Sequence, residues 1–448
     1  MACGDGSRGC IGAADSTVDS SPWDGAPEGF RSLSKAVDIQ IEPFASMVTG
    51  DFTGDGIQDS AFWYSPATIV EGPLPAYLNL AEQSTWTANI PFLDASWDSY
   101  GLASGDQGGD GVDDLAVSAY VREQSEFYVF LYDGPILEDR PLSVESADGA
   151  VVDDGVFATG SELSMGDVND DGRDDILIGA PDAIGPDISP GCAYLVLGPV
   201  SGTMSLGDAD TEFEGVEEAE GTGTLLSLRG DLNADGIGDV LIAAVDTNGG
   251  GLYLFYGPPP DGSISVADGD AVLLGSPMNE ANRLSVGDND GDGHDDVMVS
   301  DGCGYGACSG AIWVFRGPLS NSFSVEDATA TVYHDYGSSY FGNGASMDHD
   351  LDGDGRADLA GGATHDRSSE EWIGGVYIFY GPISGSLWTD DADAVIKGSR
   401  SGGEPHTGPG AYISSAGDAN GDGFDDLLFT GRDSELGDGS FIVFGGER

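Results

Sequence analysis

Seven short acidic segments could do chemistry in this sequence. They share the nine-residue pattern Asp-x-(Asp/Asn)-x-Asp-Gly-x-x-Asp, except that Thr53 and Gly108 stand at the third position of the first two copies. A hard cation such as Ca²⁺ is bound by six to eight oxygen atoms, and carboxylates spaced along a tight turn supply most of them. Gly at the sixth position lets the chain turn where a Cβ atom would interfere. The copies begin at Asp51, Asp106, Asp167, Asp231, Asp288, Asp350 and Asp418.

Each copy is predicted to bind one Ca²⁺, which gives up to seven ions in the chain. Side chains at positions 1, 3 and 5 converge on the ion, the backbone carbonyl of position 7 adds a ligand, and Asp at position 9 closes the cage with both oxygens. Binding removes repulsion among carboxylates, so calcium is expected to be mainly structural and coupled to folding. The predicted ligands are Asp51, Thr53, Asp55, Ile57, Asp59, Asp106, Asp110, Val112, Asp114, Asp167, Asn169, Asp171, Arg173, Asp175, Asp231, Asn233, Asp235, Ile237, Asp239, Asp288, Asp290, Asp292, His294, Asp296, Asp350, Asp352, Asp354, Arg356, Asp358, Asp418, Asn420, Asp422, Phe424 and Asp426.

The copies differ in their oxygen donors. Those at Asp288 and Asp350 have Asp at all four of positions 1, 3, 5 and 9, whereas Thr53 gives the first copy a weaker neutral donor. Gly108 offers no side-chain oxygen, so the copy at Asp106 is predicted to be the weakest site, with water filling the gap. Ordinary Asp-Gly hairpin turns are the alternative, but seven copies with carboxylates at positions 1, 5 and 9 disfavour it. An EF-hand is excluded, because it needs flanking helices and Glu at position 12.

The acidic segments belong to a longer repeat. Their central glycines lie between 55 and 68 residues apart, and a β-rich run such as DILIGA follows each segment. An aromatic strand ending in Gly-Pro, such as LYLFYGP, follows in most repeats. Short β-rich runs bounded by Gly, Pro and Asp indicate an all-β fold. About four strands in each of seven repeats predict a seven-bladed β-propeller with four antiparallel strands per blade.

The two ends of the chain are predicted to close the ring. The last repeat stops after its third strand, at residues 440–446, and has no fourth strand of its own. Residues 37–41 (VDIQI) alternate apolar and polar side chains, and we predict that they form the outer strand of the last blade, which leaves no open edge. The propeller then covers residues 33–448, and residues 1–32 form a flexible N-terminal tether.

The chain is strongly acidic, with 79 acidic and 15 basic residues and a formal net charge of −64. This charge excludes nucleic acid as a partner, because neutralising phosphates needs clustered Lys and Arg. No apolar run approaches the ~18 residues that a membrane span needs. Seven Ca²⁺ would leave a net charge of about −50, so metal explains only part of the acidity, and solubility in a salty or extracellular medium is the other explanation.

The five cysteines are Cys3, Cys10, Cys192, Cys303 and Cys308. Cys303 and Cys308 bracket a four-residue loop and are candidates for a short disulfide, but the sequence leaves the pairing open. The start Met-Ala-Cys3, followed by a stretch rich in Gly, Asp and Ser, resembles a bacterial lipoprotein trimmed of its signal, with Cys3 as the lipidated residue. We therefore expect an extracellular or cell-surface protein.

The repeats resemble the FG-GAP repeats of integrin α-subunit propellers. Residues 157–181 end in Gly179-Ala180-Pro181, and residues 340–363 carry Phe341-Gly342 before their acidic segment. Most copies lack either the Phe-Gly or the Gly-Ala-Pro, and all seven carry an acidic segment, unlike integrin heads. The resemblance implies calcium in hairpin loops on one face of the propeller and ligand recognition on the opposite face.

Three functions fit these features. The first is a calcium-binding recognition or adhesion module, expected to be a monomer that binds a protein or a glycan. The second is a secreted calcium-dependent carbohydrate-active enzyme such as a lyase, although no catalytic constellation is found. The third is a structural surface repeat without a ligand. Arg229-Gly230-Asp231 is disfavoured as an adhesive motif, because Asp231 begins an acidic segment. Candidate ligand-face segments are residues 97–100, 184–190, 303–308, 334–340, 365–372 and 402–409.

Overall fold

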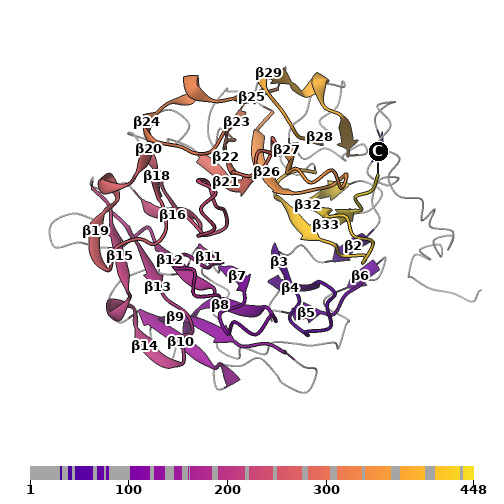
Figure 1. Cartoon of the computed structure of the whole chain (residues 1–448). Helices are drawn as coiled ribbons and strands as arrows, with labels where there is room; N and C mark the ends of the chain where they lie inside the picture. The colour runs from indigo at the N-terminus through magenta and orange to yellow at the C-terminus, as the bar shows by residue number, and fades with distance from the viewer. Residues whose placement is uncertain are drawn as a thin grey trace, which may run out of the picture.

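The strands form seven sheets around a central axis (Figure 1). This confirms the predicted all-β, seven-bladed propeller. Regular structure in the described residues is limited to strands and short turns of 3-10 helix. The computed structural model describes residues 31–32, 39–42, 46–63, 68–74, 77–79, 101–121, 126–136, 146–153, 160, 162–183, 190–216, 221–245, 250–274, 281–302, 310–334, 339–364, 374–398, 409–433 and 437–447.

Each blade begins with an innermost strand, and its second strand pairs with the first in antiparallel fashion. The acidic segment connects these two strands in every blade, as the sequence predicted. From blade 1 to blade 7 the innermost strands are β3 (Ser46–Gly50), β7 (Leu102–Gly105), β11 (Leu163–Gly166), β16 (Thr222–Ser227), β21 (Ala281–Gly287), β26 (Phe341–His349) and β31 (Ile413–Gly417). The second strands are β4 (Asp59–Trp63), β8 (Asp114–Val121), β12 (Asp175–Ala180), β17 (Val240–Ala244), β22 (Asp296–Asp301), β27 (Asp358–Ala363) and β32 (Asp426–Asp433).

The third strand of each blade continues the sheet outward, and a fourth antiparallel strand is described in six of the blades. The third strands are β5 (Thr68–Val70), β9 (Glu126–Tyr132), β13 (Cys192–Val196), β18 (Gly251–Phe255), β23 (Ala311–Phe315), β28 (Gly375–Phe379) and β33 (Gly437–Val443). The fourth strands of blades 2 to 7 are β10 (Gly149–Asp153), β15 (Thr211–Glu214), β20 (Ala271–Leu274), β25 (Ala330–Tyr333), β30 (Ala394–Lys397) and β2 (Ile39–Glu42).

A fifth, parallel strand at the outer edge of six sheets was not predicted. We call these strands the strap strands, because each pairs with the fourth strand of the preceding blade. Those of blades 3 to 6 lie between the third and fourth strands of their own blade. In four blades a turn of 3-10 helix follows the strap strand: η2 (Leu206–Asp208), η3 (Val266–Asp268), η5 (Val325–Asp327) and η6 (Thr389–Asp391). The strap strands are β6 (Tyr77–Asn79), β14 (Gly202–Ser205), β19 (Gly262–Ser265), β24 (Asn321–Phe323), β29 (Gly385–Trp388) and β1 (Arg31–Ser32).

The N-terminal strand closes the ring as predicted. β2 pairs with β33 in antiparallel fashion, with Ile39 opposite Ile442. The strand spans Ile39–Glu42, one residue beyond the predicted end, and residues 37 and 38 of the predicted strand lie outside the described residues. β1 pairs with β30 of blade 6 and so fills the strap position of blade 7. The division of the chain into a tether at 1–32 and a propeller at 33–448 stays a prediction.

The apolar core lies between neighbouring blades. Met298 and Ile312 of blade 5, for example, pack in one cluster with Leu359 and Phe379 of blade 6. Because each blade is covered on both faces, its middle strands are continuously buried; all six residues of β12 and all five of β18 are buried. A single blade would leave both apolar faces in water, so the blades are stable only as a closed stack.

Candidate metal centres

The seven acidic segments are tight loops on one face of the ring, which we number by position 1 to 9 and name by their first residue. Gly at position 6 has a φ between 80° and 91° in all seven loops, a left-handed conformation that disfavours any residue with a Cβ atom. Its N–H donates to Oδ2 of the position-1 carboxylate at 2.7–2.9 Å in every loop. The nine-residue pattern recurs because all seven loops share one turn geometry.

The position-1 carboxylate is held by several backbone donors at once. In the Asp288 loop, Oδ1 accepts hydrogen bonds from Gly291 N at 2.7 Å and Asp292 N at 3.1 Å. The position-5 carboxylate accepts from the N–H of position 7 in all seven loops, at 2.9–3.1 Å. These bonds fix both carboxylates and still leave lone pairs on their oxygens, since an ionised carboxylate has about four acceptor sites.

The Asp at position 9 has a role that the sequence did not reveal. It is at most 2% exposed in every loop. In the Asp288 loop, Asp296 accepts from Asn289 N at 3.2 Å through Oδ2 and from Gly317 N at 3.0 Å through Oδ1. An equivalent pair of bonds occurs in all seven blades, with the second donor a Gly just beyond the third strand. The first donor is the N–H of position 2 in five loops. In the first two loops it is the N–H of position 3, Thr53 or Gly108. Position 9 therefore ties the loop to the third strand, besides its predicted place in the cage.

Burial raises the pKa of the position-9 carboxyl in all seven loops, while its N–H donors lower it and nearby loop carboxylates raise it. The pKa rises to about 6 for Asp175 and Asp239, and to about 8 for Asp426. For Asp114, Asp296 and Asp358 it rises to about 7. A buried carboxylate that lacks a cationic partner is costly, and a bound cation would remove that cost.

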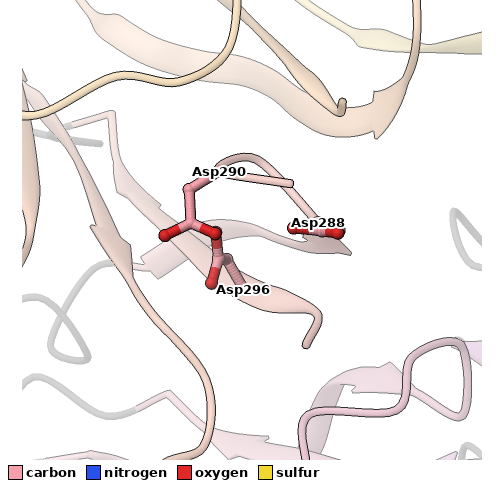
Figure 2. A group of neighbouring side chains, drawn as sticks. All are labelled: Asp288, Asp290 and Asp296. Carbon is pink, nitrogen blue, oxygen red and sulfur yellow. The ribbon is translucent and has the colours of Figure 1, made fainter. Parts of the chain in front are cut away.

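Two loops bring three carboxylates together. One ligand atom from each of Asp288, Asp290 and Asp296 lies within 4.8 Å of the others (Figure 2). Asp350, Asp352 and Asp358 form an equivalent group. These are the two loops with Asp at all four of positions 1, 3, 5 and 9.

The position-5 carboxylates of these two loops stay outside the groups. Asp292 accepts from the His294 backbone, and this bond and the His294 ring lower the pKa of Asp292. Asp354 pairs with Arg356 Nη1 at 2.9 Å. In the Asp288 loop Arg316 Nε lies 2.7 Å from Asp290 Oδ2, so a cation would share that carboxylate with the guanidinium.

The donor chemistry of the loops fits a hard cation. All predicted ligand atoms are oxygens, which suit Ca²⁺ and Mg²⁺ rather than softer metals. In the Asp418 loop, Asn420 Nδ2 donates to Asp422 at 3.0 Å, while its Oδ1 is buried without a hydrogen-bond partner. A buried acceptor without a donor is unfavourable, and a cation in the loop would satisfy it.

The Asp106 loop shows the space that a missing donor leaves. A Cβ atom on Gly108 would lie 3.7 Å from Asp106 Oδ1, 3.8 Å from Asp114 Oδ2 and 3.9 Å from Asp110 Cγ. Gly108 thus sits among three carboxylates with room for a water molecule or for a small side chain. The assignment of the loop residues as calcium ligands stays a prediction in this loop and in the other six.

Sequence reasoning also missed the carboxylate at position 8. Asp113, Asp174, Asp295 and Asp425 each accept a hydrogen bond from the backbone N–H that begins the preceding blade's loop, at 2.7–3.0 Å. The N–H of each position-8 residue in turn donates to the carbonyl of that same first residue, at 2.8–3.3 Å. The Asp-Asp pair at positions 8 and 9 was visible in the sequence, but its contact with the neighbouring blade was not.

Other sequence features have mixed outcomes. Arg229 Nη2 donates to Ser104 O and Oγ, both at 2.9 Å, and the Asp231 carboxylate accepts from its own loop, so the Arg-Gly-Asp tripeptide is tied into the ring. Cys192 is a free thiol, and the other four cysteines lie outside the described residues. Most of the predicted ligand-face segments also lie outside the described residues. Among the described residues no helix is long and apolar enough to cross a membrane.

Comparison with known proteins places these loops in a family context. The model of the FG-GAP repeat matches residues 159–189, which contain the Asp167 loop. Integrin alpha-PS2 of Drosophila melanogaster is 28% identical over 51% of this chain and 17% of its own length. Integrin alpha-5 of Xenopus laevis is 29% identical over 47% of this chain and 20% of its own length.

An enzyme is also among the relatives. Phosphatidylinositol-glycan-specific phospholipase D of Homo sapiens is 28% identical over 53% of this chain and 31% of its own length. The chain therefore spans less than a third of the length of these three relatives. Among solved structures, the rhamnogalacturonan lyase YesX aligns with a TM-score of 0.37 and 13% identity, over 88% of this chain and 65% of its own. The repeat match, the integrin relatives and the seven blades identify the chain as an integrin-like β-propeller with FG-GAP repeats.

Proposed function

We propose that this chain is a calcium-binding extracellular recognition or adhesion module, in which calcium is mainly structural. The observation that carries the calcium part is the recurrence of one loop geometry in seven blades, with three carboxylates gathered in the Asp288 and Asp350 loops. The buried Asn420 Oδ1 adds an acceptor that a cation would satisfy. The relatives named as integrins support a recognition role.

A structural role for calcium follows from where the loops lie. Each loop is bonded to its own third strand through position 9, and six of the loops accept a backbone hydrogen bond from position 8 of the next blade. A cation that neutralises one loop therefore steadies the junction between two blades. Recognition is assigned to the opposite face, where loops are free to vary without disturbing the cation sites.

Two measurements on the whole chain test this proposal. The first is the number of Ca²⁺ ions bound per chain in equilibrium dialysis against about 1 mM CaCl₂, where the proposal expects six or seven ions and fewer than three would contradict it. The second is binding to a panel of matrix proteins and glycans, with calcium and after chelation. A specific ligand that is lost on chelation supports the recognition role, while turnover of a polysaccharide would replace it with the enzyme alternative.

A variant pair separates the two parts of the proposal. Asp290→Asn removes one carboxylate of the Asp288 group and should cost one bound ion, whereas Asp261→Asn, in an exposed turn before β19, should cost none. If ligand binding survives in both variants, calcium supports the fold rather than touching the ligand. If it is lost only in Asp290→Asn while the fold persists, the ion itself contributes to recognition.

A further inference from the structure

The centre of the ring holds a cavity of about 320 Å³, separate from the acidic loops. Innermost strands from all seven blades line it. Aliphatic side chains, among them Leu102, Leu163, Leu226, Leu284 and Ile413, form part of its wall, and polar side chains form the rest. An apolar cavity of about 150 Å³ already holds a benzene molecule, so this one has room for a larger ligand.

Seven described polar side chains line this cavity, namely Asp348, Ser285, Ser346 and Ser414 besides three that come from non-adjacent blades. Glu162 comes from blade 3, Arg283 from blade 5 and Tyr412 from blade 7. The Arg283 guanidinium carbon lies 5.1 Å from the centre of the Tyr412 ring, in a cation–π contact. All three precede their acidic loops by at least five residues, which places them toward the end of the channel away from those loops.

Arg283 has hydrogen-bonding capacity that the protein does not use. Its Nη1 donates to Asn282 O at 2.7 Å, but its buried Nε has no hydrogen-bond partner. A guanidinium binds a carboxylate best through two N–H groups side by side, and the free Nε makes such a pair available.

Glu162 lines the same cavity as Arg283, and no ion pair joins these two described side chains. Its carboxyl is partly open to the cavity, but the surrounding protein raises its pKa to about 7, while the Arg283 charge lowers it. The same cavity thus offers the Arg283 guanidinium with an unused donor, the Glu162 carboxyl with its acceptor oxygens, and aliphatic side chains in part of the wall.

These charges select the class of ligand. A simple anion would meet Glu162, Asp348 and the field of a chain with a net charge of −64. A simple cation would lie near Arg283 and would leave its Nε without an acceptor. A molecule with both charges and no net charge avoids both penalties.

We propose that the central cavity binds a small apolar amino acid or a similar zwitterion. Its carboxylate is received by Arg283, its ammonium group by Glu162, and its side chain by the aliphatic part of the wall. This site is independent of the acidic loops and does not rest on the calcium proposal.

The test is calorimetric titration of the whole chain in saturating calcium with L-leucine, L-methionine and L-phenylalanine. The proposal expects at least one of them to bind. It also expects leucinamide and N-acetyl-L-leucine, which each lack one charge, to bind at least about tenfold more weakly than L-leucine. Absence of binding by all three amino acids at millimolar concentration, or equal binding of the two analogues, would overturn it.

Single-residue variants test whether binding occurs in the central cavity. Arg283→Gln and Glu162→Gln should each weaken amino acid binding at least about tenfold. Glu326→Gln is the matched control, because it neutralises an exposed carboxylate in η5 at the rim of the ring. If Arg283→Gln does not fold, the analogue series on the unmodified chain still decides the matter. Unchanged affinity in both folded cavity variants would show that any binding occurs elsewhere.

Discussion

Removing calcium should destabilise the propeller by an amount that the number of loops determines. A ligand that binds only the folded state stabilises it by RT ln(1 + [L]/Kd). Extracellular calcium modules have a Kd of about 0.1–1 mM, so at about 1 mM calcium the tighter end of that range gives about 1.4 kcal/mol per loop. Seven loops together give about 10 kcal/mol, which is comparable to the whole stability of a typical domain.

This free energy translates into a measurable shift of the melting temperature. Unfolding entropy is about 2.1 cal/mol/K per residue, which is about 0.9 kcal/mol/K for 448 residues. A loss of about 10 kcal/mol then lowers Tm by about 10 °C. Differential scanning calorimetry of the dialysed chain, with and without about 1 mM CaCl₂, measures the shift directly.

The control separates binding from screening. Any divalent salt screens a net charge of −64, so MgCl₂ at the same concentration is the proper comparison. Mg²⁺ prefers a tighter octahedral site and keeps its water, so it should restore only a small part of the shift. Equal shifts with the two salts, or a calcium shift below about 2 °C, would refute the loop-binding argument.

Three further predictions concern single features of the loops. Gly108→Asp places a carboxylate at position 3 of the Asp106 loop, so it should raise Tm in calcium and lower Tm after chelation. A lower Tm in both conditions would contradict the view that this loop has room for one more ligand. Gly293→Ala, at a φ of 87°, should cost about 1–2 kcal/mol in chemical denaturation with or without calcium, and a neutral effect would contradict the strained turn. The metal-free chain should lose stability as pH rises from about 4 to 8, because burial raises the folded-state pKa of the position-9 carboxyls above the unfolded value, to about 8 for Asp426. The calcium-loaded chain should instead gain stability over this range, and parallel Tm profiles of the two forms would contradict the prediction.

The sequence was sufficient for the fold because its signals are local. Each repeat by itself shows the turn with Gly at position 6 and the order of its strands. Ring closure by β2 was predicted because the last repeat has no fourth strand of its own. The strap strands were missed because their segments, such as GTMS in β14, are short and largely exposed and carry no apolar period. Their strand character comes from the parallel partner in the neighbouring blade.

At the candidate site, too, features within one repeat were predictable and contacts between repeats were not. The loop pattern predicted that positions 1, 3, 5 and 9 converge. In the Asp288 and Asp350 loops the structure gathers positions 1, 3 and 9, whereas position 5 lies outside both groups. What the pattern could not give is any contact between repeats, because spacing along the chain says nothing about which loop faces which. The position-8 bonds and the meeting of Glu162, Arg283 and Tyr412 in the central cavity both depend on closure of the ring.

The position-8 contacts divide the ring unequally. A carboxylate at this position joins the loops of blades 1, 2 and 3, those of blades 4 and 5, and those of blades 6 and 7. Gln58, Gly238 and Ala357 replace it at the remaining three junctions. Burial raises the pKa of Asp174, Asp295 and Asp425, so these carboxylates add to the electrostatic cost of a metal-free junction. Since a cation in either loop of a joined pair offsets that cost, the ions within each group should support one another, and the three junctions without a carboxylate are where that mutual support is weakest.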